Sequence, residues 1–162
     1  MGNTGETCAL EYGISREQSD AYSIRSHELS AEGWENGEIG KECVSMEELS
    51  IDEGIRMDAD MSTLISLKPV FSEDGQVTAG NASQVSDGAS AVLIASEETA
   101  NRMGLPIWAR IVDYTTSGVE PNRVMSAPIP AVEELLSRNK LNVEDVGSVS
   151  YTHLTLPTTQ VV

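Results

Sequence analysis

The chain opens with a helical pattern that polar and small residues interrupt. Ser15, with a glutamine three positions later, forms a capping box, which predicts that a helix begins there. The apolar stripe of this helix is loose, and later glycines close it. A shorter helix precedes it and ends near Gly13, with Asn3 or Thr4 as its cap. Residues 1–36 are therefore predicted to form two consecutive helices.

Residues 38–74 are acidic and less regular. A short strand is predicted at 43–46, and a helix at 62–67 ends before a proline that cannot continue it. The segments 52–56 and 73–75 predict turns, because they combine acidic residues with glycine.

Residues from 77 to 148 show short apolar runs in alternation with helices. The runs at 91–95 and 108–115 are rich in aliphatic residues and predict strands. Between them Ser96 caps a helix that ends near Gly104, and a last helix is predicted at 128–140. This alternation is typical of the α/β class.

Composition narrows the classes of function. The chain has 162 residues, enough for one domain with a core, and carries 10 Lys and Arg against 26 Asp and Glu. A net charge of −16 disfavours nucleic acid and anionic membranes as partners. No apolar run reaches the roughly 20 residues of a membrane span, and no signal-peptide pattern is present. Cys8 and Cys43 are too few for a disulfide framework, so we expect a reducing, cytoplasmic location.

The most informative segment is the run of glycine and small residues at 75–91. Small residues ahead of a strand let another backbone or a ligand approach closely. On residue types alone, a tight turn is the favoured explanation of the run.

This run and its surroundings resemble the thiolase family, whose members join or split acyl-CoA thioesters. Thr78-Ala79-Gly80-Asn81-Ala82-Ser83 followed by Asp87-Gly88-Ala89 is the most specific match. Further matches stand in order along the chain, at Met1-Gly2, 12–18, 52–56, 64–71, 109–112, 118–121 and 128–131.

The resemblance implies a fold of two similar βαβαβαββ halves, with an inserted loop domain that grips coenzyme A. Residues 1–74 would be part of the loop domain, 75–106 the end of the first half, and 107–148 the start of the second half. The expected fold is therefore a partial thiolase α/β fold, truncated at both ends. The parent enzyme would be a homodimer or homotetramer.

The resemblance also implies which residues contact coenzyme A or acyl-CoA, the substrate. Arg56 and Thr63 match residues near the nucleotide, and Ser83 a hydroxyl that binds a pantetheine amide. Ala79 and Gly80 match backbone that lies against the pantetheine arm. Phe71 and Met1 match apolar walls of the same tunnel. As alternatives, Phe71 is a core residue and Arg56 a solvated turn residue.

Thiolase chemistry needs residues that this chain does not contain. The family uses a nucleophilic cysteine in Val-Cys-x-Ser-Gly, a histidine in Gly-His-Pro, a second cysteine and an asparagine in Asn-Glu-Ala-Phe. We therefore assign no catalytic residue, no metal and no covalently bound cofactor. The expected function is that of a fragment of an acyltransferase of fatty acid and lipid metabolism, itself inactive. The alternative is a non-catalytic thiolase-like carrier of coenzyme A or lipid.

The last residues, 149–162, depart from the family. They resemble one translated frame of an adapter used in transposase-based sequencing libraries, and we expect them not to be native. The alternative is a natural tail rich in strand-forming residues.

Overall fold

Helices dominate the computed structural model, which describes residues 1–147, 150–151 and 154–155. The α-helices are α1 (Gly2–Tyr12), α2 (Arg16–Glu35), α3 (Met61–Ser66), α4 (Glu97–Met103) and α5 (Pro128–Asn139). Short 3-10 helices are η1 (Ile39–Lys41), η2 (Pro121–Ser126) and η3 (Val143–Asp145). Strands β1 (Ser150–Tyr151) and β2 (Leu154–Thr155) pair in antiparallel fashion.

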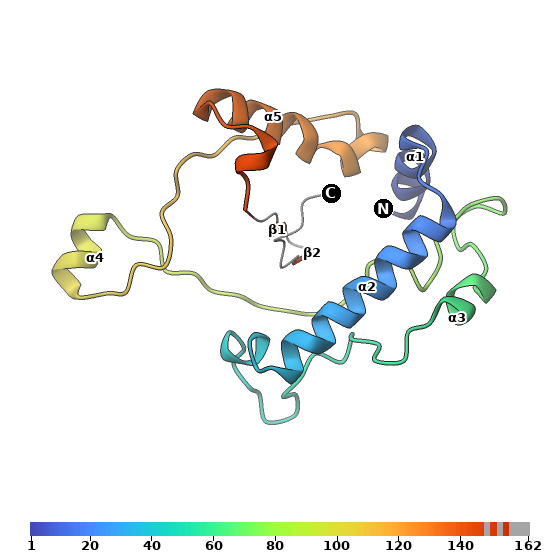
Figure 1. Ribbon diagram of the computed structural model, residues 1–162, viewed down its shortest axis with the longest axis horizontal. Coiled ribbons are helices and arrows are strands. Elements are labelled where there is room, and N and C mark those ends of the chain that lie inside the picture. The colour runs from blue at the N-terminus through green and yellow to red at the C-terminus, as the bar shows by residue number, and fades with distance from the viewer. Residues whose placement is uncertain (148–149, 152–153, 156–162) are drawn as a thin grey trace.

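The long helix α2 organises the N-terminal region, with α1 at its start and α3 beside it (Figure 1). The predicted capping box is confirmed, because Ser15 and Gln18 exchange hydrogen bonds of 2.8 and 3.2 Å. Gly13 ends α1 in a left-handed conformation, as predicted. The predicted cap of α1 is wrong: Met1 is the N-cap, and the Thr4 hydroxyl inside the helix donates to the Met1 carbonyl.

The strands predicted at 43–46, 91–95 and 108–115 are absent from the described structure. The last two run as single extended segments on either side of α4 (Figure 1). A strand exists only beside a hydrogen-bonded neighbour, and no described segment pairs with these. Residue 46 instead pairs with Leu49 in a tight turn. The α/β expectation therefore holds only coarsely, since the helices form and the sheet does not.

Helix α4 stands apart from the other helices, at the end of the two extended segments (Figure 1). Its boundaries match the prediction: the Ser96 hydroxyl accepts the Thr99 N–H at 3.2 Å, and Gly104 ends the helix in a left-handed conformation. Helix α5 is also confirmed, and Arg138 in its last turn forms an ion pair with Asp113 of the preceding extended segment.

The predicted adapter-derived tail lies mostly outside the described residues. Within it only β1 and β2 are described, so its origin stays a prediction. Among the described residues, no helix is long and apolar enough to cross a membrane.

Candidate functional site

A buried polar cluster fixes the turn at residues 78–81 against α2. Asp20 of α2 is fully buried and accepts hydrogen bonds from Arg16 Nε at 2.7 Å and from Asn81 Nδ2 at 2.9 Å. Asn81 Oδ1 in turn accepts the backbone N–H of Thr78, also fully buried, at 2.8 Å. Because a buried carboxylate is tolerated only when its oxygens are paired, these bonds hold the turn in one place.

The same cluster attaches α3 to α2. The Arg16 guanidinium donates to the carbonyl oxygens of Leu64 at 2.6 Å and Leu67 at 3.1 Å. These carbonyls lie at the C-terminal end of α3, where a cation is favoured by the helix dipole. The helix that carries Thr63 is therefore oriented by a residue of α2.

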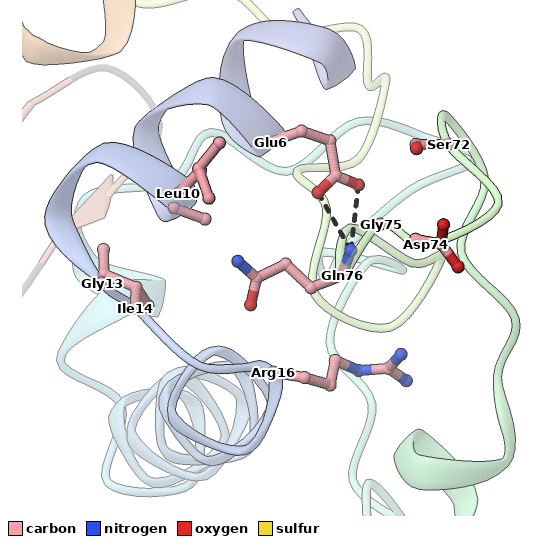
Figure 2. A pocket seen from close by; sticks show the side chains of 10 residues that line it. Glu6, Leu10, Gly13, Ile14, Arg16, Ser72, Asp74, Gly75 and Gln76 are labelled. Atoms are coloured by element: carbon pink, nitrogen blue, oxygen red, sulfur yellow. Dashed lines mark hydrogen bonds between the residues drawn. The ribbon is translucent and has the colours of Figure 1, made fainter.

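Glu6 of α1 holds the loop that leads into the turn. Its carboxylate accepts the backbone N–H groups of Gln76 and Val77, each at 2.9 Å. Within the loop, the Val70 N–H donates to the Val77 carbonyl at 3.0 Å. Figure 2 shows Glu6 reaching from α1 toward Gln76.

A cavity of about 520 Å³ lies between α1, the start of α2 and the loop 72–76 (Figure 2). Glu6, Arg16 and Asp74 are its charged lining residues. None of the seven residues predicted to contact coenzyme A lines it. The predicted coenzyme A contacts therefore lie outside this cavity.

Two predicted apolar walls lie at the start of α1. The Phe71 ring lies against Gly2, because a Cβ built on Gly2 would come within 2.2 Å of the ring. Phe71 keeps 47% of its surface exposed and Met1 keeps 74%, so both remain open to a ligand. The structure thus places Phe71 against Gly2, the residue that follows Met1.

Gly80 is tightly packed, but its neighbours belong to the protein. A Cβ at Gly80 would lie 2.8 Å from Leu67 Cδ1 and 3.0 Å from Leu64 Cγ. The packing of α3 therefore favours glycine here, independently of any pantetheine arm. Ala79 beside it is exposed.

The loop that carries Arg56 is held from two sides. The Arg56 backbone N–H donates to Nδ1 of His27 on α2 at 3.2 Å. On the other side, Gln84 Nε2 donates to the Gly54 carbonyl. This second bond places the loop beside the segment that contains Ser83, and both Arg56 and Ser83 are exposed.

Thr63 has a capping role in α3. Asp60, the N-cap, accepts the Thr63 N–H at 3.1 Å and the Thr63 hydroxyl at 2.5 Å. Hydrogen bonds from Ser62 and then from Thr63 lower the pKa of Asp60 to about 2. The Thr63 hydroxyl is therefore engaged within the protein and would have to be shared with a ligand.

Sequence reasoning assigned no role to Glu6, Arg16, Asp20 or His27. Arg16 and Asp20 do carry a signal, since they stand at the i, i+4 spacing of a helical ion pair. Glu6 and His27 carry none, because their partners lie 70 and 29 residues away.

The cysteines are free thiols, Cys8 half-buried and Cys43 exposed. Burial, and then the nearby Glu11 carboxylate, raise the pKa of the Cys8 thiol. A raised pKa disfavours the thiolate, which is the nucleophilic form.

Comparisons with known proteins agree with this architecture. The family model described as thiolase, N-terminal domain, matches residues 1–98. The 3-ketoacyl-CoA thiolase of Bacillus subtilis (strain 168) is 37% identical over 164 residues, which cover 91% of this chain and 42% of the relative. The chain belongs to the thiolase family.

Solved thiolases share the fold as well. The dimeric peroxisomal thiolase of Saccharomyces cerevisiae superposes with a TM-score of 0.84 at 35% identity, over 91% of this chain and 39% of the other. Human mitochondrial 3-ketoacyl-CoA thiolase in complex with CoA superposes with a TM-score of 0.85 at 36% identity, over 90% of this chain and 38% of the other. The chain thus spans about two fifths of the length of the relatives it matches.

Proposed function

We propose that this chain carries a coenzyme A-binding surface of a thiolase. The observation that supports this most directly is the placement of Arg56. It is the only basic residue between positions 42 and 60, and the hydrogen bonds that its loop donates to His27 and accepts from Gln84 hold the loop beside Ser83. An exposed guanidinium at this point supplies the cation that an anionic nucleotide needs on an otherwise acidic surface.

The rest of the ligand would follow the turn. The nucleotide end would lie near Arg56 and Thr63, and the pantetheine arm would cross Ala79 and Gly80 with an amide bonded to Ser83. The exposed side chains of Phe71 and Met1 would line the path of the pantetheine arm.

The whole protein would transfer acyl groups between coenzyme A thioesters, by Claisen condensation or thiolytic cleavage, through an acyl-cysteine intermediate. The chain itself would be inactive, because the nucleophile and base patterns of the family are not in its sequence. A Val-Cys-x-Ser-Gly and a Gly-His-Pro in the parent gene would distinguish this function from a carrier without catalysis.

Assembly and location belong to the same proposal. The yeast relative is described as dimeric, which supports a homodimeric or homotetrameric parent. We propose a cytoplasmic location from the cysteine usage and the acidic composition, although relatives described as peroxisomal and mitochondrial exist. The domain division at 74, 106 and 148 is likewise proposed.

Calorimetric titration of the chain with coenzyme A tests the binding proposal. Arg56→Ala should weaken binding about 10- to 100-fold, the range expected for a lost hydrogen bond to a charged group. Arg102→Ala, on the separate helix α4, is the matched control and should leave affinity unchanged. Absence of saturable binding to the unaltered chain, or equal affinity in the two variants, would refute the proposal.

A further inference from the structure

His27 stands out because its ring nitrogen bonds backbone rather than a side chain. Nδ1 accepts the Arg56 N–H at 3.2 Å, across 29 residues of sequence. A nitrogen that accepts a hydrogen bond carries no proton, so the ring must be neutral with its proton on Nε2. The half-buried ring therefore joins α2 to the loop that bears the site's cation.

We propose that His27 is a positioning residue for ligand binding: its unprotonated Nδ1 holds the Arg56 loop, so that capture of an anionic nucleotide at Arg56 requires neutral His27. Protonation would place an N–H against the Arg56 N–H and remove the acceptor. The inference deepens the binding proposal and, for its consequence on affinity, rests on that proposed function.

The charges around His27 are consistent with this role. Among the described residues, the charged group that acts on His27 is the Arg56 guanidinium. Burial lowers the pKa of His27 first, and the Arg56 guanidinium lowers it further. Since the folded pKa is lowered, the bond is complete at neutral pH and is lost as the pH falls through that lowered value.

Two substitutions of His27 distinguish the loss of the hydrogen-bond acceptor at Nδ1 from the loss of the imidazole ring. His27→Asn places an amide oxygen near the position of Nδ1 and cannot gain a proton, whereas His27→Gln places its amide near Nε2. We expect His27→Gln to weaken coenzyme A binding about three- to tenfold, as for one lost hydrogen bond. His27→Asn should restore the affinity and flatten its dependence on pH between 5 and 8, roughly the range where histidine titrates.

A ligand control and a direct probe complete the experiment. Pantetheine, which lacks the nucleotide, should bind all three proteins equally. Hydrogen exchange followed by NMR should show the Arg56 amide protected in the unaltered chain and in His27→Asn, and unprotected in His27→Gln.

The outcomes distinguish the positioning role of His27 from the proposal that the chain binds coenzyme A. Equal protection of the Arg56 amide in all three proteins, or equal loss in both variants, would overturn the role of His27. A parallel loss of pantetheine affinity would also overturn it, because it would indicate general damage to the fold. If coenzyme A fails to bind the unaltered chain while the Arg56 amide responds as expected, the binding proposal fails and the positioning of the loop stands.

Discussion

Residues 1–84 and residues 85–147 lie on one chain but are held in shape by different means. In the first region, buried Asp20 and the Glu6 carboxylate bind segments that are distant in sequence. In the second, the two extended segments leave their apolar side chains open, with Leu93 77% and Trp108 92% exposed. The first region contains its own polar partners, whereas the extended segments of the second have no described strand partner.

The difference lies in the kind of interaction each region depends on. Buried apolar side chains are few throughout the described residues, namely Ala9, Leu64 and Ala100. The N-terminal region therefore depends on directional polar contacts, which need only a few well-placed residues. The extended region depends on strand pairing, which needs a neighbouring backbone for every residue.

Asp20→Ala should give the largest effect, because it leaves the Arg16 guanidinium and the Asn81 amide without their carboxylate. Breaking a buried pair costs about 3–5 kcal/mol, and the lower end applies here because Arg16 keeps 21% of its side-chain surface exposed. Native-state hydrogen exchange of the Thr78 amide measures the loss of local stability.

The matched control is Glu97→Ala, which breaks the ion pair with Arg110 in the extended region. Both side chains are largely exposed, at 62% and 74%, so the expected cost is at most about 1 kcal/mol. Equal losses of local stability in Asp20→Ala and Glu97→Ala would show that the two regions do not differ in this respect.

Gly80→Ala should have an intermediate effect. Its Cβ would lie 2.8 Å from Leu67 Cδ1, and overpacking of this kind costs about 1–3 kcal/mol. Gly88→Ala is the control, because a Cβ there meets nothing within 4 Å and should be neutral or slightly stabilising. Thermal unfolding of the two variants checks this, and a neutral Gly80→Ala would show that α3 does not require glycine at this position.

Acid should affect the two capped helices differently, and this is the smallest effect. The pKa of Asp60 is lowered from 3.8 to about 2, so its contribution to α3 is complete above 3.8 and is lost as the pH falls through about 2. The Thr63 amide resonance should titrate with that midpoint. The cap of helix α4 is the Ser96 hydroxyl, which accepts the Thr99 N–H and carries no acid proton in this range, so this cap should not be lost.

Asp60→Asn tests the assignment, since asparagine is a good neutral N-cap. The acid response of Thr63 should disappear while α3 persists. A response that survives this substitution would point to another group.

Local signals predicted the helices well. Ser15 and Ser96 marked the starts of α2 and α4, and Gly13 and Gly104 marked helix ends, because a cap involves residues only a few positions apart. The predicted strands failed because a strand is completed by a partner that its own sequence does not describe. The buried cluster was missed for a similar reason, since the bond from Asn81 to Asp20 joins positions 61 residues apart.

The bond between Glu6 and Gln76 has a consequence for the order of folding. Glu6 stands 70 residues before Gln76 in the sequence, so its carboxylate has no backbone partner until those residues have been added. Helix α1 can therefore dock against this loop only after both segments have been synthesised. The N-terminal region should therefore reach its native arrangement only after residues 76–84 have emerged.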